Sequence, residues 1–345
     1  MASLESNPAS PESPPIVSDE IIARGAQLLA AGELVAIPTE TVYGLAADAT
    51  NPMAVRKIFA AKGRPADHPL IVHIAYPDEI DRWGTEIPPA AWDLAAAFWP
   101  GPLTMIVRRR SNVDSVVAGG LDTIAVRCPS HPVAQRLLRE LGRGVAAPSA
   151  NKFGHVSPTT AAHVLAEFGD TLPLVIDGGA CEVGLESTIV DLSQSTPTIL
   201  RPGAISQTDL ELVLGLAIGD PHANSTPCSG RLASHYAPNC IVEIVTEEEL
   251  TSKLASLDAS GRRVGLLATE EGSVRALAAL PADRIVWLPS DAKLYARGLY
   301  GALRAADERG FDHFLVVSPP LGHPLSAAIL DRLQKAAGPR DSRRG

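Results

Sequence analysis

The stretch from residue 217 to residue 239 constrains the fold more than any other part of the sequence. It has no hydrophobic periodicity, and it reads as a run of small, polar and turn-forming residues from Gly219 to Pro227. A stretch of this length is too long for an ordinary loop inside a compact domain. The chain has 345 residues, enough for two domains that each bury a core. We therefore interpret residues 217–239 as an interdomain linker.

Upstream of the linker, residues 17–216 predict an α/β domain with an irregular topology. A first helix is expected to begin after Ser18, a good N-cap, and to end at Gly32. Further helices are expected over residues 53–61, 90–98, 133–141 and 160–168, and strands over 34–37, 70–74, 103–109, 123–127, 144–147, 174–176, 187–192 and 198–200. Several strands follow one another without a helix between them, so the sheet is predicted to be mixed.

Downstream of the linker, residues 240–338 predict a small doubly wound, Rossmann-like α/β domain, because strands and helices alternate regularly. Strands are expected over residues 241–245, 264–267, 285–288 and 313–317, and helices over 247–257, 273–280, 292–306 and 326–337. The domain has no Gly-x-Gly-x-x-Gly motif, which favours a docking or lid-supporting role. Residues 1–16 are predicted to be a disordered tail and residues 339–345 a flexible one.

Charge and composition exclude several classes of function. The net charge of −9 opposes strong direct nucleic-acid binding, because the overall field repels a phosphate backbone. No apolar run is long enough to span a membrane, and the first residues do not resemble a signal peptide. The four cysteines are scattered, which fits a reduced, cytoplasmic environment.

Two short polar motifs are the first indication of function. Lys62-Gly63-Arg64 follows a predicted helix, and Ser149-Ala150-Asn151 follows a predicted strand. Gly63 is expected to end the helix, and Pro65 prevents it from resuming. Two cations and two neutral hydrogen-bonding side chains would form a pocket for a polyanion such as a nucleoside triphosphate. The alternative for the two cations alone is a solvated pair that complements the helix dipole.

Polar side chains also occupy the ends of other predicted strands. The segment Thr39-Glu40-Thr41 follows the strand 34–37, where it either lines a cavity or bonds its own backbone in a capped turn. Arg127 shares a strand face with Thr123 and Ala125 by period-two alternation. Its guanidinium pairs either with a structural carboxylate or with the carboxylate of a ligand.

Glu186-Ser187 and Arg201 are also polar residues at the ends of predicted strands. Arg201 is a third candidate for a cation that binds phosphate. The small residues before Ser149 would let a ligand approach the backbone, or would simply pack tightly. His68 and His73 border one loop, but no Cys, Asp or Glu stands at a matching ligand spacing, so we expect no protein metal site. A serine nucleophile is not expected, since there is no Gly-x-Ser-x-Gly elbow.

In these motifs the chain resembles the threonylcarbamoyl-AMP synthase family, in its long form with a YrdC-like catalytic domain and a C-terminal domain. The resemblance spans roughly residues 17 to 240. It is carried by Pro38-Thr39-Glu40-Thr41-Val42-Tyr43-Gly44-Leu45, Lys62-Gly63-Arg64-Pro65, His68-Pro69-Leu70-Ile71-Val72-His73, Trp99-Pro100-Gly101-Pro102-Leu103-Thr104, Gly120-Leu121-Asp122-Thr123-Ile124-Ala125-Val126-Arg127, Ala147-Pro148-Ser149-Ala150-Asn151, Glu186-Ser187-Thr188-Ile189, Leu200-Arg201-Pro202-Gly203 and His235-Tyr236-Ala237-Pro238. The resemblance implies a mixed, twisted sheet with a concave active-site face.

The family resemblance also implies a reaction. L-Threonine, bicarbonate and ATP would give threonylcarbamoyl-AMP and pyrophosphate, for the modification of the tRNA adenosine next to the anticodon. The implied partner is a downstream tRNA threonylcarbamoyl transferase, and Mg²⁺ is expected to accompany ATP. No side chain needs to act as a covalent nucleophile.

Motif correspondence assigns residues to the two substrates. Threonine contacts are expected at Thr41, His73, Arg127, Ala147 and Ser187, with Arg127 on the carboxylate. ATP contacts are expected at Lys62, Arg64, His68, Thr123, Ser149, Asn151, Ser157, Arg201 and Tyr236. Of these, Lys62, Arg64, Ser149 and Asn151 are the predicted catalytic set.

One departure from the family pattern concerns the linker, which is expected to reach over the active site. Ser229-Gly230-Arg231 stands where the family usually has Pro-Gly-Met, so its closure is an open question. An RNA-binding YrdC-like module without synthase activity is the alternative function, opposed by the net charge and the 4% aromatic content. A carbamoyltransferase would normally carry zinc-finger and acylphosphatase-like modules as well.

Overall fold

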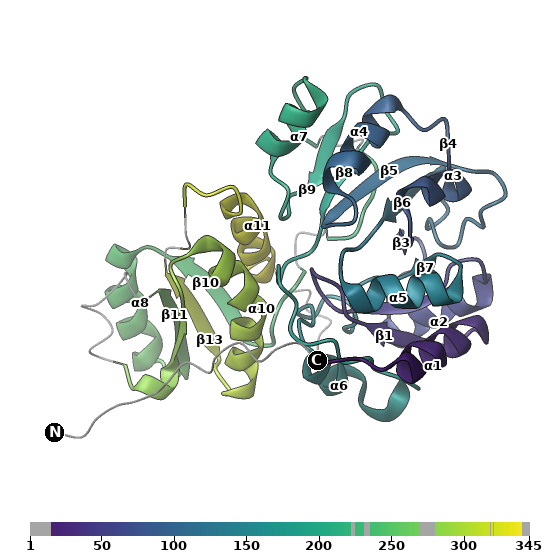
Figure 1. Ribbon diagram of the computed structural model, residues 1–345. Helices are drawn as coiled ribbons and strands as arrows, with labels where there is room; N and C mark the ends of the chain where they lie inside the picture. The colour runs from purple at the N-terminus through teal and green to yellow at the C-terminus, as the bar shows by residue number, and fades with distance from the viewer. Residues whose placement is uncertain are drawn as a thin grey trace.

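The computed structural model describes residues 15–221, 225–230, 235–269, 280–317, 319 and 321–339, which form two β-sheets with their own helices (Figure 1). In the first sheet, the strands described are ordered β1-β2-β7-β3-β6-β5-β8-β9, and β4 pairs with β5. Their bounds are Val35–Ile37 (β1), Gly44–Asp48 (β2), Ile71–His73 (β3), Gly84–Thr85 (β4), Leu103–Arg109 (β5), Thr123–Arg127 (β6), Val145–Ala146 (β7), Thr188–Asp191 (β8) and Thr198–Arg201 (β9). Pairs β3–β6 and β5–β8 are parallel and the others antiparallel, so the predicted mixed sheet is confirmed.

Seven α-helices are described around this sheet, together with short 3₁₀ turns. They are Asp19–Ala30 (α1), Pro52–Lys62 (α2), Ile80–Trp83 (α3), Pro89–Phe98 (α4), Pro132–Leu141 (α5), Ala161–Phe168 (α6) and Gln207–Leu214 (α7), with 3₁₀ turns at Pro77–Glu79 (η1) and Gly169–Thr171 (η2). Ser18 caps α1 as predicted, because its side chain accepts a hydrogen bond from the Ile21 amide.

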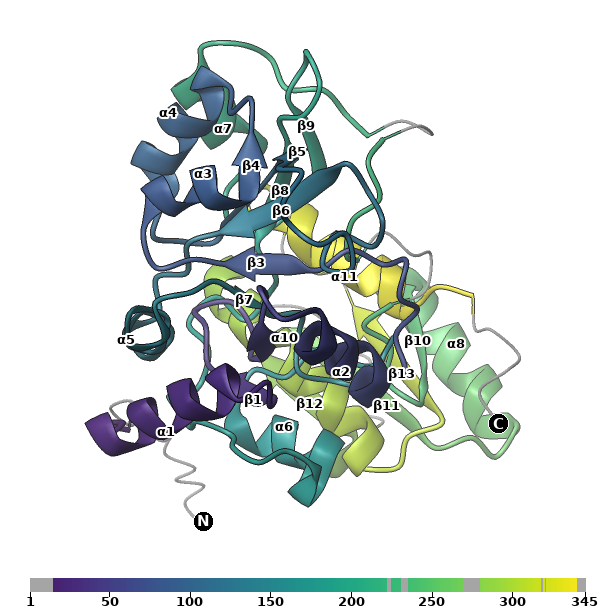
Figure 2. The same cartoon turned by 90° about the vertical axis from the view of Figure 1, so that its right-hand side faces the viewer.

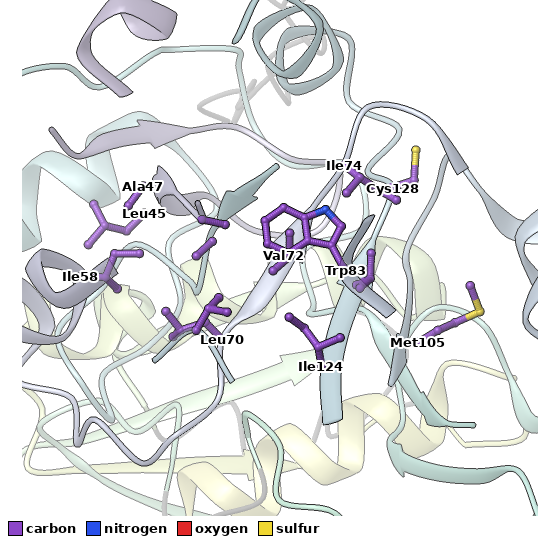
Figure 3. Packing of buried hydrophobic residues seen from close by; sticks show 14 of the residues in the cluster. Leu45, Ala47, Ile58, Leu70, Val72, Ile74, Trp83, Met105, Ile124 and Cys128 are labelled. Carbon is purple, nitrogen blue, oxygen red and sulfur yellow. The ribbon is translucent and has the colours of Figure 1, made fainter. Parts of the chain in front are cut away.

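The main hydrophobic core of the first domain lies against one face of the first sheet. Helices α2, α4 and α6 pack there against alternate strand residues, and Figure 3 shows Ile58, Val72 and Ile124 among them. Helices α1 and α5 cover β1, β2 and β7 from the opposite side. Because side chains alternate along a strand, residues next to Val72 and Ile124 point away from this core.

The opposite face of β3, β6, β5 and β8 carries a small apolar cluster rather than a covering helix. The cluster consists of Ile71, Ile106, Ala125, Ile189 and Leu200, and Cys228 of the linker packs against it. Arg127 and His73 belong to the same strand face by the two-residue period of β6 and β3. Strand alternation therefore places polar side chains on the face that the helices leave open.

The second sheet is formed by parallel strands in the order β10-β13-β11-β12 among the residues described. The elements are Ile241–Val245 (β10), Glu247–Ala259 (α8), Val264–Thr269 (β11), Ala282–Arg284 (η3), Ile285–Leu288 (β12), Ala292–Glu308 (α10), His313–Val317 (β13) and Ser326–Ala336 (α11). Leu250 of α8 packs on one face and α10 and α11 pack on the other. This arrangement confirms the predicted doubly wound domain.

Several sequence predictions of secondary structure were incomplete. Strands β2 and β4 and helices α3 and α7 were not predicted, and residues 174–176 contribute only a single bridge, between Val175 and Ala36. Residues 273–279 of the helix predicted over 273–280, and most of both predicted tails, lie outside the described residues. No helix of the part described is long and apolar enough to cross a membrane.

Helices α10 and α11 are the part of the second domain that faces the first (Figures 1 and 2). The backbone of α10 passes so close to Gly184 that a Cβ there would lie 2.4 Å from the Arg297 Cα. Gly184 also has a φ of +75°, a conformation that glycine adopts readily. Arg304 of α10 forms an ion pair of 3.0 Å with Glu167 of the first domain. The second domain is therefore packed against helix α6 and the loop that contains Gly184 in the first domain.

Candidate active site

A cavity of about 520 Å³, counting the space at its mouth, lies on the open face of the first sheet. Its lining comes from chain segments that are far apart in the sequence, namely Thr39, Thr41, Val42, Gly44, Arg64, Ile71, His73, Arg127, Ala147, Pro148, Ser149, Glu186, Ser187, Arg201, Ser229, Gly230, His235 and Tyr236. Nine of the predicted substrate contacts are in this lining: Thr41, Arg64, His73, Arg127, Ala147, Ser149, Ser187, Arg201 and Tyr236.

The two motifs Lys62-Gly63-Arg64 and Ser149-Ala150-Asn151 are in direct contact. Lys62 is the last residue of α2, and Gly63 ends the helix in a left-handed conformation. The Lys62 ammonium donates to the Ser149 carbonyl at 2.6 Å and to the Asn151 carbonyl at 2.5 Å. Burial, together with the nearby Arg64 charge, holds the pKa of Lys62 well below its usual range. Lys62 therefore connects the two motifs by its hydrogen bonds, but it does not itself line the cavity.

Arg64 reaches the cavity directly. Its guanidinium donates to the Pro69 carbonyl at 2.9 Å and to the Ser229 hydroxyl at 3.0 Å, and so joins the first sheet to the linker. Burial lowers the pKa of Arg64 to about 10, which leaves the side chain charged at neutral pH. Arg64 therefore places a positive charge in the cavity lining, where the sequence predicted one.

Arg127, which also lines the cavity, is held by two residues of the loop between β1 and β2. Its guanidinium donates to the Thr41 hydroxyl at 2.8 Å and pairs with the Glu40 carboxylate at 2.7 Å. Burial alone would raise the pKa of Glu40, but the charge and hydrogen bond of Arg127 together with backbone hydrogen bonds outweigh burial, and the pKa is lowered. Of the two partners considered from the sequence, a structural carboxylate is therefore present.

His73 has a fixed tautomer. Its Nδ1 lies 3.2 Å from the Ile71 carbonyl, which can only accept, so Nδ1 carries the hydrogen. Burial, and then the Arg127 charge, lower the pKa of His73 to about 3, so the ring is neutral near pH 7. Its Nε2 is consequently a hydrogen-bond acceptor.

Ser187 and Arg201 form the third side of the cavity. The Ser187 hydroxyl lies 2.7 Å from the Thr104 hydroxyl and accepts from Arg201 at 3.0 Å. Arg201 also donates to the Ser187 carbonyl at 3.1 Å and to the Ser229 carbonyl at 3.2 Å. Arg201, the third candidate cation, thus contacts both Ser187 of the first domain and Ser229 of the linker.

The linker covers part of the cavity. Ser229, Gly230, His235 and Tyr236 are in its lining, while Arg231 lies outside the described residues. Gly230 has a φ of +84°, and a Cβ there would stand 2.1 Å from the Tyr236 hydroxyl. Only glycine fits this close approach.

Four further predicted contacts lie near the cavity without lining it. Asn151 is buried and donates to the Lys152 and His155 carbonyls. Thr123 lines a neighbouring hollow with Ser229, and the His68 ring lies 5.3 Å from the ring of Phe153. Ser157 donates to Glu186 at 2.6 Å.

The sequence interpretation missed two residues of the second domain that touch this wall. Tyr300 of α10 and Arg332 of α11 donate to the Glu186 carboxylate, each at 2.7 Å. A signal was available for Arg332, because it stands on the apolar face of its helix between Ile329 and Leu333. A charge at a core position needs a buried partner.

Similarity to known proteins identifies the family to which this chain belongs. A family model described as "Telomere recombination" matches residues 27–203, and one described as "Threonylcarbamoyl-AMP synthase, C-terminal domain" matches residues 205–338. A curated threonylcarbamoyl-AMP synthase of Pyrococcus abyssi is 39% identical over 320 residues, which cover 90% of this chain and 92% of that protein. The chain belongs to the threonylcarbamoyl-AMP synthase family.

Other threonylcarbamoyl-AMP synthases are similarly related. The protein of Bacillus subtilis is 41% identical over 333 residues, covering 94% of each chain. The crystal structure of P. abyssi Sua5 complexed with L-threonine has a TM-score of 0.86 and 37% identity, covering 94% of this chain and 96% of that one. The predicted YrdC-like fold with a second α/β domain is therefore confirmed.

Proposed function

We propose that this protein joins L-threonine, bicarbonate and ATP to give threonylcarbamoyl-AMP and pyrophosphate. The main observation behind the proposal is that one cavity contains both groups suited to a triphosphate and groups suited to an amino acid. Arg64, Arg201 and Ser149 suit the triphosphate, while Thr41, Arg127 and Ser187 suit a small amino acid. A relative solved with L-threonine has the same fold over nearly the whole chain.

For threonine, we propose that Arg127 binds the carboxylate. Its NH2 is already paired with Glu40 at 2.7 Å and its NH1 bonded to Thr41 at 2.8 Å, so its orientation is fixed before the substrate arrives. The neutral His73 offers Nε2 as an acceptor for the amine or hydroxyl of threonine. Orientation before binding lowers the entropic cost of the reaction.

For ATP, the proposal assigns the phosphates to Arg64 and Arg201. Both are buried, which strengthens their attraction for a polyanion because little water screens it. Lys62 acts indirectly, by fixing the backbone of Ser149 and Asn151. The threonine amine would attack the carbon of bicarbonate, and water would leave to give the carbamate. The carbamate would attack the α-phosphorus through its carboxylate oxygen, and the bond to the bridging oxygen would break to release pyrophosphate.

The residues of the cavity do not fit a magnesium site of the protein's own. The carboxylate at the wall, Glu186, accepts three hydrogen bonds, and the Glu40 carboxylate behind it is paired with Arg127. Within the described residues, no three His, Cys, Asp or Glu side chains gather as a metal site. We propose that Mg²⁺ comes with the triphosphate, which supplies oxygen ligands of the kind it prefers.

The proposal includes what the family implies beyond the reaction. The product would pass to a tRNA threonylcarbamoyl transferase in the cytoplasm, and no strong direct binding of tRNA to this protein is expected. The net charge of −9 supports that last point, because any RNA contact would have to overcome it.

The test is pyrophosphate release by the full-length protein with ATP, bicarbonate and threonine, each omitted in turn. We expect release only when all three are present. Release without threonine, or no release, would overturn the proposal. Tight, salt-sensitive RNA binding by the same inactive protein would instead support the RNA-binding module.

A further inference from the structure

The Glu186 carboxylate links the two domains at the cavity wall. It is 6% exposed and accepts hydrogen bonds from Ser157 at 2.6 Å, from Tyr300 at 2.7 Å and from Arg332 at 2.7 Å. Tyr300 and Arg332 belong to helices α10 and α11 of the second domain. Two of the three donors on this carboxylate therefore come from outside the domain that forms the rest of the cavity.

Arg332 makes several contacts at once and is itself fully buried. Besides Glu186, its guanidinium donates to the Pro202 carbonyl at 3.0 Å and pairs with Asp331. It also lies 5.3 Å from the centre of the Tyr236 ring, in cation–π geometry. A planar guanidinium can serve these partners together, which a lysine ammonium cannot.

Three of these contacts, those with Glu186, Pro202 and Tyr236, are with a proposed substrate-binding residue or with a residue beside one. Glu186 holds the Ser157 hydroxyl and directly precedes Ser187. Pro202 directly follows Arg201, which is in the cavity lining. Arg332 is not in that lining itself, so any effect it has on the substrates passes through its neighbours.

We propose that Arg332 is a positioning residue for the active site. From the last helix of the second domain, it fixes Glu186, Pro202 and Tyr236, and so sets the geometry of the substrate-binding groups beside them. This role rests on the proposed function. It also gives the second domain a task in the reaction, as a support for the cavity wall from outside the lining.

The alternative is that the ion pair only stabilises the packing of the domains. A second interdomain ion pair, Arg304 with Glu167 at 3.0 Å, provides a comparison, because neither residue lines the cavity. Arg304 also donates to the Val156 carbonyl, beside Ser157, whereas Arg332 contacts the side chains of Glu186 and Tyr236 in the cavity lining itself. A purely structural role predicts the same behaviour for both pairs. A positioning role predicts that only the Arg332 pair affects the kinetics.

The experiment measures kcat and KM for ATP and for threonine in full-length Arg332→Met, Glu186→Gln, the double variant and Arg304→Met, at a temperature where all are folded. We expect Arg332→Met to lower kcat/KM for ATP by about 10- to 100-fold, by analogy with the loss of a group that orients a metal ligand. Arg304→Met should lower the melting temperature but keep kcat and both KM values near those of the wild type.

The double variant separates a joint role from two independent ones. If Arg332 acts through Glu186, the loss in Glu186→Gln/Arg332→Met should be no larger than that of the worse single variant. Additive losses, or normal kinetics in Arg332→Met, would overturn the inference. If Arg332→Met does not fold, Arg332→Lys and Tyr300→Phe take its place, with smaller losses in the same direction expected and wild-type kinetics contradicting the inference.

Failure of the proposed function would be visible separately. A wild type that releases no pyrophosphate in the presence of threonine refutes that function. The inference is then tested by the ATP affinity of the same variants in calorimetry, where Arg332→Met should bind ATP at least about tenfold more weakly than Arg304→Met. Equal affinities would refute the positioning role.

Discussion

The Glu186 carboxylate should make the stability of the protein sensitive to acid. Burial opposes its charge, but the charges of Arg332 and Arg201, together with the hydrogen bonds from Ser157 and Arg332, outweigh burial and lower the pKa of Glu186 to about 2, from an ordinary value of 4.5. The folded protein therefore prefers the charged form more strongly than the unfolded chain does. This preference stabilises the fold above about pH 4.5 and is lost as the pH falls toward 2.

The magnitude follows from the difference between the two pKa values. A difference between 4.5 and about 2 is worth about 3 kcal/mol at neutral pH. By linkage, roughly half of that contribution remains at pH about 3. Because Glu186→Gln removes the charge, the difference in unfolding free energy between wild type and variant should shrink in the same way.

Urea unfolding at several pH values between about 7 and 3 measures this difference, and urea avoids the ionic screening that a guanidinium salt would add. Other carboxylates with lowered pKa values, such as Glu40 and Glu167, are present in both proteins, so their effects largely cancel. A difference that stays constant over this pH range would refute the reasoning, since it would mean that Glu186 carries no preferentially stabilised charge.

Three further predictions concern the cavity. Arg127→Met should weaken threonine binding at least about 30-fold in calorimetry, because it removes one member of a buried charge pair as well as the proposed carboxylate ligand. Gly230→Ala should raise the KM for ATP about 10- to 100-fold, because its Cβ would stand 2.1 Å from the Tyr236 hydroxyl. Lys62→Met should lower the unfolding free energy by about 1 to 3 kcal/mol in urea, because two buried carbonyls lose their donor.

Each of these predictions has a control or a contradicting result. Arg136→Met removes a partly exposed ion pair with Asp19 and should leave threonine affinity unchanged. Gly215→Ala imposes similar backbone strain, since φ is +66°, but its Cβ meets no atom within 4 Å. An equal KM in the two glycine variants would contradict the role of close packing. Unchanged stability of Lys62→Met would show that its contacts with the carbonyls contribute little.

Local patterns in the sequence predicted the parts of the fold that depend on neighbouring residues. The alternation along Thr123–Arg127 correctly indicated which side chains share a face, because the two-residue period of a strand is local. Strand β2 escaped prediction because Gly44–Asp48 consists largely of small residues with weak strand propensity. All five of its residues are buried, so tertiary packing decides its conformation.

In the candidate site, too, the sequence predicted residues in contiguous motifs but not contacts between distant residues. The family motifs pointed to nine of the residues that line the cavity, since each motif is contiguous in the sequence. The partners of Glu186 could not be predicted in this way, because Arg332 lies 146 residues away and belongs to the other domain. Glu40 was read as either a cavity residue or a turn residue, and only the folded chain shows it paired with Arg127.

The central claim is that one cavity joins carbon from bicarbonate to threonine and to the adenylate of ATP. Mass spectrometry of the product formed from ¹³C-labelled bicarbonate, threonine and ATP tests it most directly. The proposed function predicts a compound with the mass of threonylcarbamoyl-AMP, heavier by one labelled carbon. AMP or ADP as the only nucleotide products, or an unlabelled product, would contradict it.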